Sequence, residues 1–141
     1  MNKLLITAIA YFFLFISVAC ASKSHSEVSA GTPIKKVSVG NLTATLANST
    51  GQLKKGEQEV VLSFTDSAGK PVDVGAVSLN LHMPAMGSMA AMNEAVTFTT
   101  TGTPGSYRGK VNISMAGEWQ GQLAYEGASG SGKTTFSVTA Q

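Results

Sequence analysis

Residues 34–141 are predicted to form an all-β domain, on three observations. Apolar and polar residues alternate with a period of two, clusters of turn residues separate the alternating segments, and no segment shows helical periodicity. Segments with one apolar face each can bury those faces when two sheets pack against each other. We therefore expect one immunoglobulin-like (Greek-key) β-sandwich of about seven strands.

Each predicted strand is defined by its apolar positions, which should face the core. Residues 40–41 interrupt the first strand, where we expect a bulge. Turns are expected over 66–71 and 102–105, and a Gly/Ser loop over 127–133. In chain order, the inward positions are Val37, Val39, Leu42, Ala44 and Leu46; Val60, Leu62 and Phe64; Val77, Leu79, Leu81 and Met83; Val96 and Phe98; Tyr107, Gly109, Val111, Ile113 and Met115; Trp119, Gly121, Leu123 and Tyr125; Phe136 and Val138.

Residues 1–20 are predicted to be a secretory signal peptide. Lys3 precedes an uncharged apolar run over 4–18, and small residues follow that run. A membrane-spanning helix needs ~20 apolar residues, whereas polar sequence begins here at Ser22. The segment is therefore expected to direct export rather than to remain as an anchor.

Two cleavage reactions fit the end of the signal. Ala19-Cys20-Ala21 suits ordinary signal peptidase, whereas residues 17–20 resemble a bacterial lipobox, in which the cysteine is acylated. Lipidation of Cys20 is favoured because the chain has no other cysteine and because residues 21–33 read as a flexible tether. The domain would then lie in the bacterial envelope, at the outer membrane facing the periplasm in a Gram-negative cell.

Composition and motifs exclude several functions. The formal charge is only +2 and the lysines form no basic stripe, so we expect no nucleic acid partner. The chain contains no His-x-x-x-His, Cys-x-x-Cys or Gly-x-Ser-x-Gly motif, and we do not expect an enzyme. Residues 127–134 match the letters of a P-loop, but strand-like sequence follows where a helix is required, so we expect a hairpin loop.

Methionine is concentrated in one segment that starts beside a histidine. Four of the six methionines lie between residues 83 and 92, and His82 directly precedes them. We expect this segment to be a loop or a single turn. Thioethers beside an imidazole are soft ligands that suit Cu(I) better than harder ions. The sequence therefore predicts a copper site formed by His82, Met83, Met86, Met89 and Met92.

Other roles for these residues stay open. Met83 continues the apolar face of its strand and suits the core, while His82 lies on the polar face and suits solvent. The remaining methionines can cap the open end of the sandwich or bind an apolar partner, which would make the protein a tethered interaction module contacting a membrane or efflux protein. His25 in the tether can bind Cu(II) near a processed N-terminus, although a solvated linker residue is favoured.

Three blocks together resemble the YtkA-like and FixH-like domains of bacterial envelope proteins. The blocks are residues 81–87 (LHMPAMG), 104–109 (PGSYRG) and 115–119 (MAGEW). The resemblance implies an immunoglobulin-like sandwich as the fold. It also implies a role in copper handling or in cytochrome oxidase maturation, and hence a copper transporter or an oxidase as partner. Relatives commonly place a histidine shortly after the second methionine, whereas Gly87-Ser88-Met89 has none, which makes a mainly thioether site the alternative to a His/Met site.

Overall fold

The computed structural model describes residues 31–141, and all of its regular elements are strands. The predicted signal peptide, Cys20 and most of the predicted tether lie outside the described residues. Within the described part, no helix is long and apolar enough to cross a membrane. The eight strands are β1 (Thr32–Val39), β2 (Leu42–Asn48), β3 (Gly56–Thr65), β4 (Ala76–Met83), β5 (Met92–Thr100), β6 (Ser106–Ile113), β7 (Gly117–Gly127) and β8 (Gly130–Ala140).

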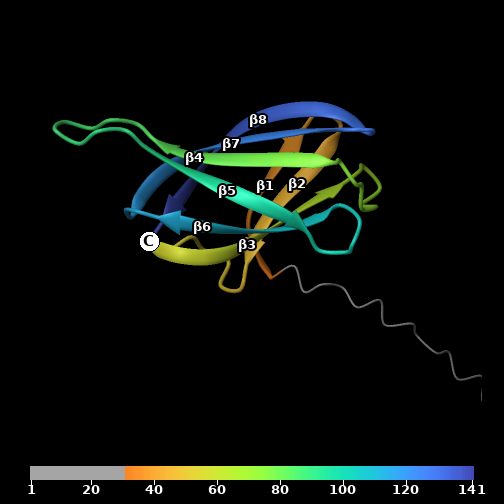
Figure 1. The fold of residues 1–141 in the computed structure, drawn as a ribbon, viewed down its shortest axis with the longest axis horizontal. Coiled ribbons are helices and arrows are strands. Elements are labelled where there is room, and N and C mark those ends of the chain that lie inside the picture. The colour runs from red at the N-terminus through yellow and green to blue at the C-terminus, as the bar shows by residue number, and fades with distance from the viewer. Residues whose placement is uncertain (1–30) are drawn as a thin grey trace, which may run out of the picture.

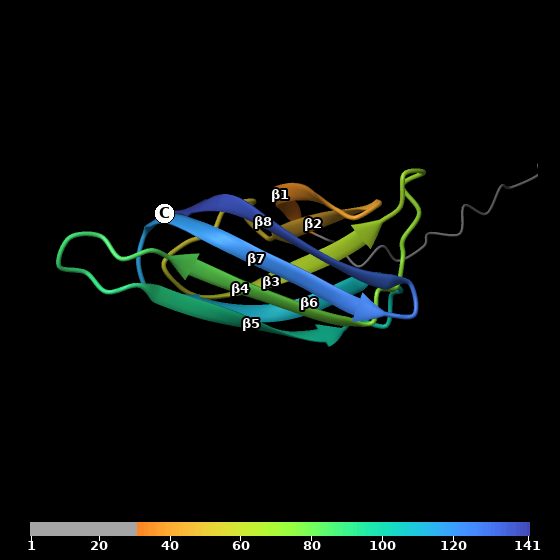
Figure 2. The same ribbon diagram turned by 90° about the horizontal axis from the view of Figure 1, so that it is seen from above.

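The strands form an antiparallel sheet that folds over on itself into a nearly barrel-shaped sandwich (Figures 1 and 2). Their order is β1-β2-β3-β6-β5-β4-β7-β8, so the connections β3–β4 and β6–β7 each pass over two strands, as in a Greek key. Strand β5 joins the two halves, because residues 92–96 pair with β4 and residues 97–100 pair with β6. The predicted all-β fold is confirmed.

The number of strands differs from the prediction at the first segment. Gly40 and Asn41 form a two-residue hairpin turn between β1 and β2, with Val39 paired to Leu42, and not the predicted bulge. Gly40 has φ 62°, the left-handed conformation that tight hairpin turns demand and that glycine adopts without steric cost. One predicted strand is therefore two strands, which makes eight.

The core lies between the two halves and follows the predicted alternation. Trp119 is fully buried, and its indole nitrogen donates a hydrogen bond to the Met115 carbonyl at 3.0 Å. Phe64 meets the rings of Tyr107 and Tyr125 edge-on, with ring centroids 6.0 and 5.5 Å apart. Such edge-to-face contacts stabilise aromatic pairs beyond the effect of burial alone. A single aromatic cluster thus links strands from both halves.

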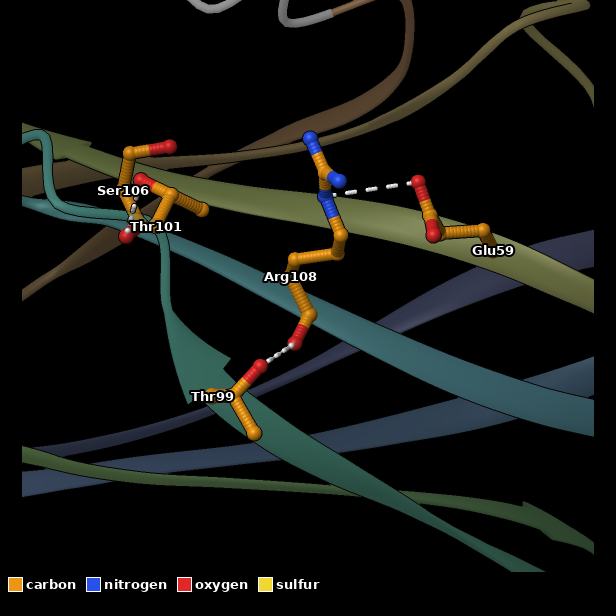
Figure 3. A network of polar contacts seen from close by, with 5 residues as sticks. All are labelled: Glu59, Thr99, Thr101, Ser106 and Arg108. Carbon is orange, nitrogen blue, oxygen red and sulfur yellow. Dashed lines mark hydrogen bonds and ion pairs between the residues drawn. The ribbon is translucent and has the colours of Figure 1, made fainter.

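The outer face of the β3–β6 half is polar and charged (Figure 3). Arg108 lies 3.4 Å from a carboxylate oxygen of Glu59, but both side chains are about half exposed, so this ion pair stabilises little. The Thr99 hydroxyl donates to the Arg108 carbonyl at 3.3 Å, and the Thr101 hydroxyl donates to the Ser106 carbonyl at 3.0 Å. These hydrogen bonds hold the end of β5 against β6.

Tyr107 fixes the loop between β3 and β4, at the opposite end of the domain from the β4–β5 hairpin (Figure 1). Its hydroxyl donates to the Asp73 carboxylate at 2.8 Å and accepts from the Val74 backbone N–H at 3.0 Å. Burial, and then the hydrogen bond to Asp73, raise the pKa of Tyr107 above its ordinary value. Hydrogen bonds from the Gly75 backbone and then from Tyr107 lower the pKa of Asp73.

Tyr107→Phe is expected to lower the free energy of unfolding by roughly 1–3 kcal/mol, because the Val74 N–H stays buried without an acceptor. In the wild type the folded state holds the phenol proton more tightly than the unfolded state does. The contribution of Tyr107 to the free energy of unfolding is therefore complete below pH 10.0, the ordinary tyrosine pKa. That contribution is lost as the pH rises through the raised pKa of Tyr107 in the folded state. Denaturant unfolding followed by Trp119 fluorescence measures the free energy of unfolding at each pH. As the pH rises above 10.0, this free energy should fall less in Tyr107→Phe than in the control Tyr125→Phe. An equal loss in both variants would contradict the assignment.

Candidate functional site

The methionine-rich segment is a hairpin that extends β4 and β5 beyond the body of the sandwich (Figures 1 and 2). Met86 and Met89 exchange two backbone hydrogen bonds, of 3.1 and 2.9 Å, around a turn at Gly87-Ser88. Gly87 has φ 55°, as expected for glycine at the first central position of a tight hairpin turn. The predicted loop or single turn is therefore a tight hairpin.

Met86 and Met89 face each other across the tip of this hairpin. They are 56% and 39% exposed, and they are the large hydrophobic residues that the described part of the chain leaves in solvent. The Cβ atoms of such directly opposed residues lie ~4.5–5.5 Å apart, a separation that two flexible methionine side chains easily close. The tip therefore presents two thioether sulfurs that can bind one soft ion together.

Met83 and Met92 form a second pair, on the inner face. Met83 is 1% exposed and is the Cα partner of Met92, which is half-buried against the core. The Ser114 hydroxyl donates to the Met92 sulfur at 3.4 Å, and a Cβ atom on Gly117 would lie 3.0 Å from the Met83 methyl group. The core role left open for Met83 is thus confirmed, and the turn between β6 and β7 packs over this pair.

His82 lies on the outer face of β4, where its side chain is half-buried. Its Nδ1 is 2.9 Å from Asn93 Oδ1, which also accepts a 3.3 Å hydrogen bond from the Asn80 amide. Because that oxygen only accepts, we assign the imidazole proton to Nδ1 from this network. The Nε2 lone pair is then available to a ligand, as in histidines whose other nitrogen is held by an outer-shell acceptor. The sequence did not single out Asn93.

The five predicted ligands are therefore divided between two faces. His82, Met83 and Met86 border a hollow of about 460 Å³. Met89 faces Met86 at the tip, whereas Met83 pairs with Met92 on the inner face. Residues 31–141 contain no group of three or more His, Cys, Asp or Glu side chains placed to hold a metal ion. The polar residues around the hollow come from β4, β7 and β8 and include His82, Glu118, Gln120 and Ser137.

The three sequence blocks lie at the two ends of this architecture. The first and third meet where the methionine hairpin leaves the sandwich and the β6–β7 turn covers its base. The second contains Tyr107, at the other end of β6. Together with the strand order, they define an immunoglobulin-like β-domain that carries a methionine hairpin.

The chain belongs to the YtkA-like family, whose model matches residues 36–124, from within β1 to within β7. The family resemblance predicted from the three blocks is thereby confirmed. Neither the curated proteins nor the solved structures with which the chain was compared give a match.

The contact between His82 and Asn93 predicts a particular imidazole tautomer. Nitrogen-detected NMR at alkaline pH should show the imidazole proton of His82 on Nδ1. Asn93→Ala removes the acceptor and should shift the population toward the Nε2-protonated form. Asn112→Ala, an exposed change on β6, serves as the control and should leave the tautomer as in the wild type. Protonation of Nε2 in the wild type would overturn the assignment.

Proposed function

We propose that this protein is an envelope lipoprotein that binds Cu(I) through its methionine hairpin, for copper handling, resistance or oxidase maturation. The observation that carries this proposal is the exposed, directly opposed pair Met86 and Met89. Thioether sulfur is a soft ligand, which suits Cu(I) better than zinc, magnesium or calcium. It carries no proton to lose, so its availability does not depend on pH.

The placement of the pair favours transfer of the ion over permanent storage. Two thioethers leave Cu(I) open to further ligands, and the tip stands in solvent where sulfur atoms of a partner can approach. An ion held this way can pass between proteins by ligand exchange without unfolding either of them. A copper transporter or an oxidase assembly protein in the membrane is the proposed recipient.

The same exposure supports a second candidate function, as a metal-independent interaction module. Methionine side chains are flexible and polarisable, and they adapt to apolar surfaces of different shape. In this alternative the tip docks into an apolar groove of a membrane or efflux partner. The two functions differ in one respect, because docking requires only apolar volume whereas copper binding requires sulfur.

Replacing Met86 and Met89 by leucine removes both sulfurs and keeps the apolar volume. We expect Cu(I) affinity to fall at least about tenfold, equivalent to ~1.4 kcal/mol. The measurement is a competition titration against a chromophoric Cu(I) chelator, with the full chain purified in detergent. All samples carry Cys20→Ser, so that the sulfur of Cys20, acylated or free, cannot compete for the ion.

The matched control replaces the inner pair, Met83 and Met92, by leucine. These swaps conserve volume, so each should cost less than ~1.5 kcal/mol of stability and leave Cu(I) affinity at the wild-type value. If the tip variant binds Cu(I) as tightly as the wild type, the copper proposal fails. Retention of partner binding by that variant would then favour the docking module.

The proposed anchor is tested separately. Wild-type protein should fractionate with membranes, because acylated Cys20 would hold it there through the tether. Cys20→Ala should release the protein or leave it unprocessed. Mass spectrometry of the wild-type N-terminus identifies the cleavage. A soluble wild-type protein beginning at Ser22 would overturn the lipoprotein assignment.

A further inference from the structure

We propose that His82 and Glu118 form a second, harder metal site for Cu(II) beside the thioether pair. The proposal rests on the copper-binding function above and extends it to the other oxidation state. Its ligands are the His82 Nε2 atom and the Glu118 carboxylate. Neither composition nor motif spacing pointed to Glu118, which lies on β7, far from the methionine segment in sequence.

Strand register brings the two side chains to the same face. His82 is the Cα partner of Gln120, and Glu118 lies two residues before Gln120 in β7, on the side of the hairpin. Residues on one face that are offset by two positions across a strand pair are ~7–8 Å apart and within reach of long side chains. Bonds from a metal to nitrogen or carboxylate oxygen are ~2 Å long. An ion between these side chains can therefore be bound by both.

The hollow on the outer face agrees with this register. His82, Met86 and Glu118 all border it. The β4–β7 pairing ends at His82 and Gln120, and Glu118 follows on the hairpin side of that last pair. The Glu118 side chain thus shares the hollow with the imidazole and with the first thioether of the tip.

The electrostatics of the hollow favour a cation. Among the residues that border it, Glu118 carries the one formal charge and the others are neutral. Asn93 holds Nδ1 of the imidazole and leaves Nε2 as a ligand, an outer-shell arrangement common to metal-binding histidines. Imidazole and carboxylate ligands suit Cu(II), which such sites bind more tightly than other divalent ions of the first transition row. The adjoining Met86 and Met89 suit Cu(I).

The test compares the two oxidation states in one set of variants. The chain has two histidines, so a background of Cys20→Ser and His25→Ala leaves His82 as its one imidazole. The full chain, purified in detergent without a histidine tag, is titrated with Cu(II) and examined by pulsed EPR. We expect modulation from the remote imidazole nitrogen, and its loss in His82→Ala.

Glu118→Gln should weaken Cu(II) binding at least about tenfold and leave Cu(I) affinity unchanged. Glu118 is exposed, so this near-isosteric change leaves the fold intact. Glu126→Gln, an exposed change on the same strand, is the matched control and should bind both ions as the background does. The double change Met86→Leu and Met89→Leu should show the reverse selectivity, with Cu(I) affinity lost and Cu(II) affinity kept.

Equal Cu(II) affinity in Glu118→Gln and the background, or absence of the imidazole signal, would overturn this second site without touching the Cu(I) proposal. Conversely, unchanged Cu(I) affinity in the double methionine variant would overturn the Cu(I) proposal, while the Cu(II) result would still stand. The two failures are therefore distinguishable.

Discussion

The register of β4 against its two neighbours determines the chemistry available in this domain. Side chains alternate between the faces of a strand, so a shift of one residue would exchange every inner position for an outer one. Burial of Leu79, Leu81 and Met83 fixes the register from within. As a direct consequence, His82 is held on the outer face, beside Asn93 on one strand and Gln120 on the other. The candidate metal ligands depend on this packing for their positions.

Much of this arrangement was predictable from the amino-acid sequence. Alternation in β4 correctly placed Met83 in the core and His82 outside it, because only one face of that strand reaches the interior. The seven apolar segments were located for the same reason. Residues 127–134 also form the expected hairpin, with a tight turn between Gly127 and Gly130. Where burial dictates a period of two, the sequence carries the information directly.

The division of the methionines was not predictable from their spacing. Met86, Met89 and Met92 are three residues apart, a spacing that describes a continuous segment, but a turn at Gly87-Ser88 reverses the chain between the first two. Counting outward from that turn pairs Met86 with Met89 and Met83 with Met92, and it also places Asn93 opposite His82. The dipeptide Gly87-Ser88 was the feature of the sequence that could have indicated this turn. The turn at Gly40-Asn41 was misassigned for a similar reason, since glycine also suits a bulge.

The length of the methionine hairpin has a steric consequence. The Met86–Met89 rung is three residue steps beyond the Met83–Met92 rung on each strand, and each step advances the chain by about 3.3 Å. The tip sulfurs are therefore carried on the order of 10 Å beyond the last rung of the β4–β5 ladder. A partner can enclose the tip inside a narrow cleft while the sandwich stays outside its entrance. For the proposed Cu(I) site, a flat surface with the same donor atoms would reach fewer sides of the ion than a cleft that encloses the tip.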